Sequence, residues 1–228
     1  MRYKGLNATG YEYNTFFYQN EFEDILRGII VCCRNICSSQ ISLPNNENEI
    51  RNIIIRDYLK IEDFKKAHFN LSKYHFDYET VENNGRADIR ILPINPYIND
   101  HAYYVVECKR LDTRNLNGVT GLNAEYVKNG ICRFVTGYYS SYFKINGMIG
   151  FFVQSMLFEE NINNLNTFLS QNLINDKGET VNASHIQEII PTRIIPGFNL
   201  SYVSTHKING QDNLILYHLM FDFSKNIQ

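Results

Sequence analysis

Two acidic side chains and one lysine stand in segments whose other residues look buried. In the stretch GRADIRILPINPYINDHAYYVVECKRLD, residues 85–112, Asp88 interrupts one apolar run and Glu107 interrupts the next, which ends in Glu-Cys-Lys with Lys109. Burying an ionised group costs on the order of several kcal/mol unless another group compensates its charge. These three residues are therefore expected either to pair with one another or to hold a cation.

The spacing of these residues would bring them to one place on a sheet. Adjacent strands lie about 4.8 Å apart, so Asp88 and Glu107 at matching heights can share one hard cation such as Mg²⁺. Side chains two residues apart point to the same face of a strand, which puts Lys109 beside Glu107. A lysine there can orient a water or stabilise charge that develops on a phosphate. An internal salt bridge of Lys109 with Glu107 or Asp88 explains the same residues, and the sequence leaves both interpretations open.

The composition is that of an ordinary globular protein. The chain has 228 residues, 44% of them hydrophobic and 20% charged, so one domain with a substantial core is expected. Its net charge of −2 and pI of about 6.3 exclude a global basic field, so nucleic acid would need a local patch. The sequence shows no signal peptide, no apolar run of about 18 residues and no zinc-type spacing of its five cysteines. We expect a cytoplasmic protein with reduced thiols and no membrane span.

Hydrophobic periodicity predicts an α/β protein built around a mixed sheet. Helices are predicted over residues 21–39, 47–60, 121–143 and 159–173. Strands are predicted over residues 73–81, 86–92, 102–109 and 146–157, and the third of these is apolar enough to be central in the sheet. The turn signal Asn209-Gly210 predicts a terminal hairpin over 198–223. Residues 1–20 and 174–197 are expected to be irregular.

The motif and the order of elements resemble the PD-(D/E)xK nuclease superfamily, whose fold is that of the restriction endonucleases. In that family the Asp lies on the second core strand and Glu-x-Lys on the third, with one helix before them and another after. Here GRADIRIL supplies Asp88, and VVECKRLD supplies Glu107 and Lys109, 19 positions later. The resemblance covers residues 47–153, and it departs from the family pattern at Ala87, where a proline would precede the Asp.

The resemblance implies a fold and a metal site. The fold is a restriction-endonuclease-like mixed central sheet flanked by helices, as a single domain with an added C-terminal hairpin. Its core is 47–153, its N-terminal helical extension is 1–46, and a helix and β-hairpin occupy 154–228. The metal, Mg²⁺ or Mn²⁺, would be held by Asp88, Glu107 and the backbone carbonyl of Cys108, and Lys109 would position the attacking water.

Many members of this family add a glutamate from the preceding helix to the site. The candidates here are Glu47 and Glu49, and Glu47 is preferred because it lies nearer the side of Ile50 and Ile54, which packs inward. Both glutamates also favour the positive N-terminus of a helix without any role in a site. The sequence leaves the structural and the functional interpretation of these glutamates open.

A local basic patch agrees with a nucleic-acid partner. Residues 109–144 contain six Lys or Arg against two Asp or Glu, an excess of four positive charges that phosphates would need. Arg110 follows the motif directly, and Tyr126 and Arg133 share a helical face with Gly137, although a solvated face is an equal interpretation. We therefore expect a metal-dependent endonuclease that hydrolyses phosphodiester bonds of DNA. Cutting both strands of a duplex would favour a homodimer, and family analogy suggests prokaryotic defence or mobile elements.

Two other functions remain in view. The first is a catalytically inactive nuclease-like fold that binds nucleic acid or a protein, against which the intact Asp, Glu and Lys argue. The second is an interaction protein that uses its 16 tyrosines and 15 phenylalanines as an aromatic interface. His206 and His218 fall in the terminal hairpin without a third ligand nearby, so structural, hydrogen-bonded histidines are favoured over a zinc site or a general base.

Overall fold

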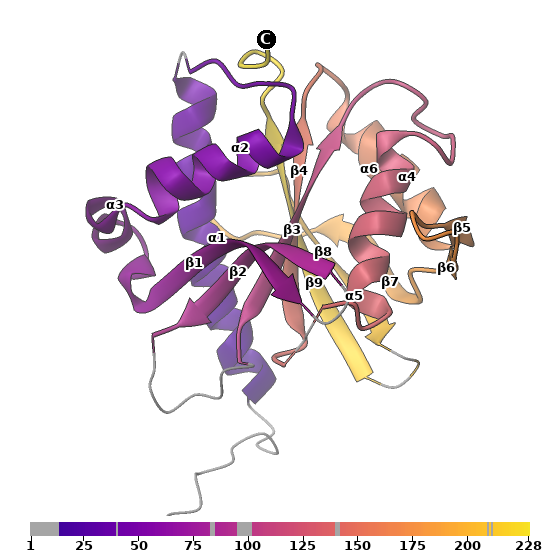
Figure 1. The fold of residues 1–228 in the computed structure, drawn as a ribbon, viewed down its shortest axis with the longest axis horizontal. Helices are drawn as coiled ribbons and strands as arrows, with labels where there is room; N and C mark the ends of the chain where they lie inside the picture. The colour runs from indigo at the N-terminus through magenta and orange to yellow at the C-terminus, as the bar shows by residue number, and fades with distance from the viewer. Residues whose placement is uncertain are drawn as a thin grey trace, which may run out of the picture.

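The computed structural model places a seven-stranded mixed sheet between two layers of helices (Figure 1). It describes residues 14–39, 41–82, 85–94, 102–139, 142–208, 210 and 212–228. The strand order is β1-β2-β3-β4-β9-β8-β7. The three middle strands, β3, β4 and β9, are parallel to one another. All other pairs of neighbouring strands in this sheet are antiparallel.

The elements follow one another along the chain with short connections. The helices are α1 (Asn14–Ser38), α2 (Glu47–Ile54), η1 (Ile55–Leu59), α3 (Glu62–Ala67), η2 (Leu71–Lys73), α4 (Leu122–Tyr126), η3 (Val127–Ile131), α5 (Cys132–Val135) and α6 (Phe158–Leu169). The strands of the main sheet are β1 (Tyr74–Glu82), β2 (Gly85–Pro93), β3 (Tyr104–Leu111), β4 (Ile145–Phe152), β7 (His185–Pro191), β8 (Ser201–Ile208) and β9 (Asp212–Asp222). A separate two-stranded hairpin consists of β5 (Leu173–Ile174) and β6 (Thr180–Val181).

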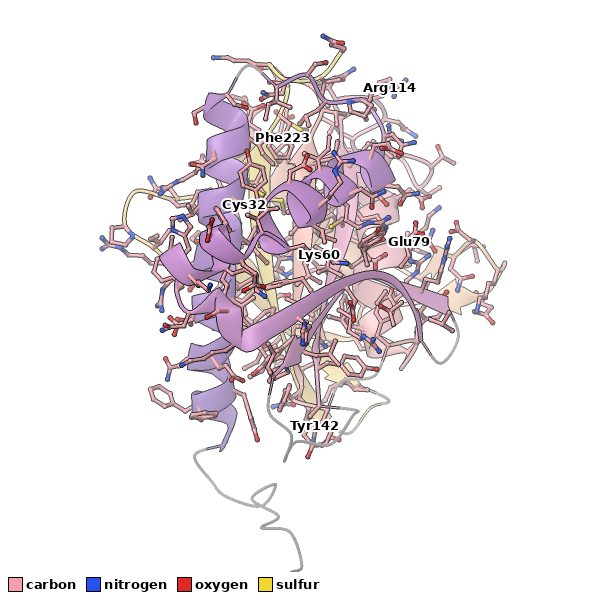
Figure 2. All side chains as sticks on the ribbon, turned by 60° about the vertical axis from the view of Figure 1, so that its left-hand side comes forward. Cys32, Lys60, Glu79, Arg114, Tyr142 and Phe223 are labelled. Atoms are coloured by element: carbon pink, nitrogen blue, oxygen red, sulfur yellow. The ribbon has the colours of Figure 1, made fainter. Side chains whose placement is uncertain are left out.

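Each face of the sheet carries its own hydrophobic cluster. The first cluster joins α1 and α2 to the sheet and contains the apolar stripe of α1, together with Cys32 and Phe223, which Figure 2 labels. The second cluster joins α4, η3, α5 and α6 to the opposite face. Strand β3 contributes to both clusters, because its alternate residues point to opposite faces and nearly all are buried. The prediction that this strand is central is confirmed.

Several element boundaries differ from the sequence prediction. Helix α1 begins at Asn14, inside the segment expected to be irregular, and α3 was not predicted. The helix predicted over 121–143 ends at Val135, and Gly137 follows with a left-handed φ of 70°, a conformation that stops helices. The segment 174–197 is not wholly irregular, since it contains β6 and the edge strand β7.

The C-terminal hairpin continues the main sheet. Strand β4 pairs in parallel with β9 along the whole length of β4, and β8 and β7 extend the sheet from β9. The predicted hairpin over 198–223 is confirmed, whereas the Asn209 of its turn signal lies outside the described residues. No helix in the described ranges is both long and apolar enough to cross a bilayer.

Candidate active site

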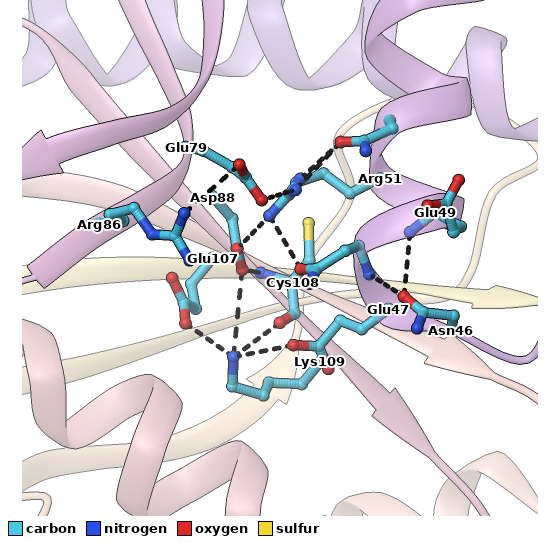
Figure 3. Close-up of polar contacts among 12 residues, drawn as sticks. Asn46, Glu47, Glu49, Arg51, Glu79, Arg86, Asp88, Glu107, Cys108 and Lys109 are labelled. Carbon is cyan, nitrogen blue, oxygen red and sulfur yellow. Dashed lines mark hydrogen bonds and ion pairs between the residues drawn. The ribbon is translucent and has the colours of Figure 1, made fainter.

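A pocket of about 490 Å³ opens where α2 meets the ends of the first three strands. Its walls come from α2, β1, β2, β3, α4, η3 and α5, from the loop after α5 and from the turn between β5 and β6. The residues that line it are Glu47, Asn48, Arg51, Glu79, Arg86, Ala87, Asp88, Glu107, Lys109, Arg110, Leu122, Glu125, Asn129, Arg133, Tyr138 and Asp176. All three residues of the predicted motif are among them, so the structure brings Asp88, Glu107 and Lys109 together (Figure 3).

A local distortion of the sheet aims Asp88 into the pocket. Ile89 packs in the first hydrophobic cluster, whereas Ala87 packs in the second, so the alternation of β2 breaks at Asp88. On the neighbouring strand, the pairing register skips Glu79, which lies opposite Asp88 and has a φ of 52°. A residue other than glycine in the left-handed region is strained, and such strain is typical of sites where a side chain is redirected.

Both carboxylate oxygens of Asp88 are held by donors from neighbouring elements. The pairing of β2 with β3 ends at Ile89, and beyond it the backbone N–H of Cys108 donates to Asp88 Oδ2 at 2.8 Å. The guanidinium of Arg51, on α2, donates to Asp88 Oδ1 at 2.7 Å. Two donors therefore fix the orientation of this carboxylate before any ligand binds.

Four oxygen atoms surround the ammonium group of Lys109. Its Nζ lies 2.7 Å from Glu107 Oε1 and 2.8 Å from the carbonyl oxygen of Cys108. It lies 3.3 Å from Glu47 Oε1 and 4.0 Å from Asp88 Oδ2. The acceptors are three carboxylates and one carbonyl, which are the hard oxygen donors that Mg²⁺ prefers. The salt bridge that the sequence offered as an alternative is present, and it lies among the same residues that were predicted to hold a cation.

Asp88, Glu107 and Lys109 form the floor of the pocket, and burial affects the charge states of Glu107 and Lys109. The side chain of Glu107 is only 1% exposed, and its burial, together with the nearby Asp88, raises its pKa to about 7 despite Lys109 and Arg133. Burial alone would lower the pKa of Lys109, but the carboxylates of Glu107, Glu47 and Asp88 outweigh it and raise that pKa. Lys109 therefore stays protonated at neutral pH, so it acts as a hydrogen-bond donor and not as a base.

Of the two candidate glutamates on α2, the structure places only Glu47 in the pocket. Asn46 caps the helix, and its side chain accepts from the backbone N–H groups of Asn48 and Glu49. Glu47 turns toward the floor, where Oε1 contacts Lys109 and Oε2 accepts from the backbone N–H of Arg110 at 2.9 Å. Glu49 is exposed on the outer side of the helix, away from the residues that line the pocket.

Sequence reasoning missed Arg51 and Glu79. Arg51 is 2% exposed and bridges Asp88 to Glu79, whose Oε1 it contacts at 2.9 Å. Arg51 follows Glu47 by four residues, so the helical spacing that selected Glu47 also selects Arg51 for the inward face. Glu79 carries no comparable signal, because nothing in the sequence predicts a left-handed backbone at a glutamate within a strand.

The three residues predicted to contact nucleic acid have different surroundings. Arg110 lines the pocket and donates to the carbonyl of Asn45, and Arg133 donates to Glu107 Oε1 at 2.8 Å. Tyr126 is fully buried, and its hydroxyl lies 2.9 Å from His218 Nδ1, so the prediction that it faces nucleic acid is wrong. The π turn η3 lies between Tyr126 and Arg133, which invalidates the regular spacing of 100° per residue that placed them on one face.

The side chains of His206, His218 and the five cysteines do not line this pocket. His206 and His218 are buried and both contact Ser204 Oγ, which confirms that they are structural and hydrogen-bonded. They are linked through that serine and are not direct partners across the strands, since His206 pairs with Leu214. All five cysteines are free thiols, as predicted, and only the thiol of Cys37 is exposed.

Comparisons with known proteins add no family to this geometry. No family model, curated protein or solved structure matches the chain. Within the described ranges, no group of three or more His, Cys, Asp or Glu side chains is arranged as a metal site. The carboxylates of Asp88 and Glu107 form ion pairs with Arg51 and Lys109.

Proposed function

We propose that this protein is a metal-dependent nuclease that hydrolyses phosphodiester bonds of nucleic acid, with DNA as the expected substrate. The observation that carries the proposal is the convergence of Asp88, Glu107 and Lys109, with Glu47 beside them, in one polar pocket. The order of helix, three strands, helix and strand over 47–153 supports the resemblance to the PD-(D/E)xK nucleases. The basic residues Arg86, Arg110 and Arg133 on the walls supply attraction for phosphates.

The donor set of the pocket suits a hard divalent cation. Asp88, Glu107, Glu47 and the carbonyl of Cys108 already collect around one positive group, the ammonium of Lys109. These residues would hold Mg²⁺ or Mn²⁺ once the flexible Lys109 side chain moves aside. Such a cation, when bound, would neutralise phosphate charge and make a water more acidic.

The side chains of the protein would orient the ligands and stabilise charge in the proposed reaction. Arg51 and the Cys108 N–H keep the Asp88 carboxylate in one orientation, which is the preorganisation that a reacting site needs. Lys109, held in its charged form, can donate to a phosphate oxygen or to the attacking water. Glu107 must be ionised to serve as a ligand, and its raised pKa makes that step sensitive to pH near neutrality.

A cleavage assay on the intact protein tests this proposal. Lys109→Ala and Asp88→Asn should each abolish cleavage of a mixed DNA and RNA panel in Mg²⁺ or Mn²⁺, with unchanged circular dichroism. Asp88→Asn is preferred to an alanine because its remaining oxygen can still accept from the buried Arg51. Glu47→Ala should lower cleavage strongly, while its control on the same helix, Glu49→Ala, should not. Cleavage that survives both Lys109→Ala and Asp88→Asn would refute the site.

The second candidate is a nuclease-like module that binds nucleic acid without cutting it. Two ion pairs favour this second function. Lys109 pairs with Glu107 and Arg51 pairs with Asp88, so these carboxylates are neutralised without a metal. Calorimetric titration with Mn²⁺ separates the two functions. A nuclease should take up the ion in a manner that Glu107→Gln abolishes, whereas a binding module should show no uptake that depends on this carboxylate.

A further inference from the structure

A smaller pocket of about 60 Å³ continues from the proposed active site. The two pockets share Asn129, Arg133, Tyr138 and Asp176. The smaller one is completed by α5 and by the turn of the β5–β6 hairpin, which supplies Lys177. This hairpin lies outside residues 47–153, the segment that resembles the nuclease family.

Tyr138 stands at the junction of the two pockets with two cations close to its ring. The guanidinium carbon of Arg133 lies over the ring, 5.2 Å from its centroid, and Nζ of Lys177 also lies over it, at 4.9 Å. A base that stacks on this ring would therefore take the place of one of these cations, which would then turn to the neighbouring phosphate. Arg133 also donates to Glu107 Oε1, so it connects the ring directly to the floor of the first pocket. Across the described stretches of the chain, Lys177 Nζ has no carboxylate within ion-pair distance, which leaves its charge available for a ligand.

An aromatic ring flanked by cations beside a phosphate-cleaving site fits one ligand chemistry. Nucleobases stack on tyrosine rings, and lysine and arginine neutralise the phosphates that join those bases. The faces of bases in a duplex are covered by their stacked neighbours, so only an unpaired base can lie on Tyr138. Resting on the proposed function, we propose that Tyr138, Arg133 and Lys177 bind the nucleotide next to the scissile phosphate, and that the substrate is an unpaired strand.

The depth of the floor agrees with an unpaired substrate. The side chains of Glu107, Lys109 and Asp88 are 1%, 10% and 14% exposed, so a phosphate must enter the pocket to reach them. A cavity of about 490 Å³ is of the size that encloses a small ligand, and one or two nucleotides are of that scale. An unpaired strand can reach these side chains without a complementary strand that must also fit between the walls.

Binding of labelled oligonucleotides of about 12 nucleotides, in EDTA to prevent cleavage, tests this inference on the full chain. A DNA strand and the matching RNA strand should bind about tenfold or more tightly than the same DNA annealed to its complement. Tyr138→Leu should weaken binding of the single strand about 5- to 150-fold, while Tyr138→Phe, which keeps the ring, should not. Lys177→Gln should lower the slope of log affinity against log salt by about 0.7, the value of one phosphate contact.

The chain offers a matched control for both substitutions. Lys60 lies 4.7 Å from the ring centroid of the exposed Tyr78, the same kind of contact, but neither residue lines the two pockets. Tyr78→Leu and Lys60→Gln should therefore leave binding unchanged. Figure 2 labels Lys60 and, close to the candidate active site, Glu79.

The outcomes separate this inference from the proposed function. Cleavage of the same oligonucleotides is measured in Mg²⁺ and Mn²⁺ with wild-type protein. Nucleic acid that is cut as fast when paired as when unpaired, or equal binding by Tyr138→Leu and Tyr138→Phe, would overturn the inference and leave the nuclease proposal standing. A protein that neither binds nor cuts any of the oligonucleotides would overturn both.

Discussion

The buried histidine pair predicts a loss of stability in mild acid. Four hydrogen bonds form a continuous network. The Tyr126 hydroxyl is bonded to His218 Nδ1, and Nε2 of each histidine is bonded to Ser204 Oγ. His206 Nδ1 lies 2.8 Å from the carbonyl oxygen of Ala183. The carbonyl can only accept, so His206 donates there and accepts from Ser204. Ser204 then accepts from His218, and His218 accepts from the Tyr126 hydroxyl. Every donor of this network has an acceptor when both rings are neutral. A proton added to either ring would find no free acceptor within the network.

The expected magnitude follows from the pKa values of the two rings. Burial lowers the pKa of His206 to about 4 and that of His218 to about 3, from 6.5 for an unperturbed histidine. Below pH 6.5 the unfolded chain therefore binds protons that the native state does not bind. The contribution of the two histidines to the free energy of unfolding is present above pH 6.5 and is lost as the pH falls. Between pH 7 and pH 5 each histidine should remove about 2 kcal/mol from the free energy of unfolding.

Glu107 acts with the opposite sign over the same range. Its pKa is raised from 4.5 to about 7, so its contribution is present at low pH and is lost as the pH rises through 7. The wild-type protein alone therefore reports a sum of opposing effects. The difference between wild type and a histidine variant isolates the histidine, because Glu107 is common to both.

Urea denaturation at pH 7 and pH 5 measures this difference. His218→Gln should be less stable than wild type at pH 7, because the chain through Ser204 and Tyr126 is broken, and its further loss at pH 5 should be about 2 kcal/mol smaller. If this variant does not fold, the ring-proton shifts of both histidines in wild type give the same answer, since they should keep neutral values at pH 5. Equal losses for variant and wild type, or histidines that titrate near pH 6.5, would refute the assignment.

Two further predictions concern the residues that hold Asp88. Arg51→Met should lower the free energy of unfolding by about 3–5 kcal/mol, because it leaves Asp88 without its buried partner, and adding Asp88→Asn should restore part of that loss in urea denaturation. Glu79→Gly should be about 1 kcal/mol more stable than Glu79→Ala by the same measurement, because both lose the carboxylate but only glycine adopts a φ of 52° without strain. Equal stability of the two Glu79 variants would contradict the strain.

The sequence predicts which charged residues meet in the pocket better than it predicts the backbone that brings them together. Asp88, Glu107 and Lys109 stand out because charges are rare in apolar strands, and the two-residue spacing puts Glu107 and Lys109 on one face. The local distortion of β2, which the sequence does not show, turns Asp88 toward them. Arg51 was within reach of the same reasoning, since it lies one helical turn from Glu47. Glu79 was not, because its role depends on a left-handed backbone that only the three-dimensional register of β1 and β2 imposes.

The elements that sequence reasoning missed lack a periodic signal. Strand β7 lies at the edge of the sheet with two register shifts against β8, and only Ile189 of its residues is buried, so its apolar residues do not alternate cleanly. The opposite error occurred after α5, where aromatic residues continue the helical period beyond Gly137 although the chain has already turned. In both cases tertiary contacts decided the backbone, and the local pattern did not.

A purely structural role does not explain the ion pairs of the pocket, Arg51 with Asp88 and Lys109 with Glu107. Buried ion pairs contribute little to stability relative to apolar residues of similar volume, because desolvation offsets their attraction. A chain selected only for stability would therefore fill this space with hydrophobic side chains, as it does on both faces of the same strands. Here it keeps a cavity of about 490 Å³, orients Asp88 with two donors and tolerates a strained Glu79 beside it. Costs of this kind, concentrated at one polar pocket, are those expected of a site that binds and acts on a ligand.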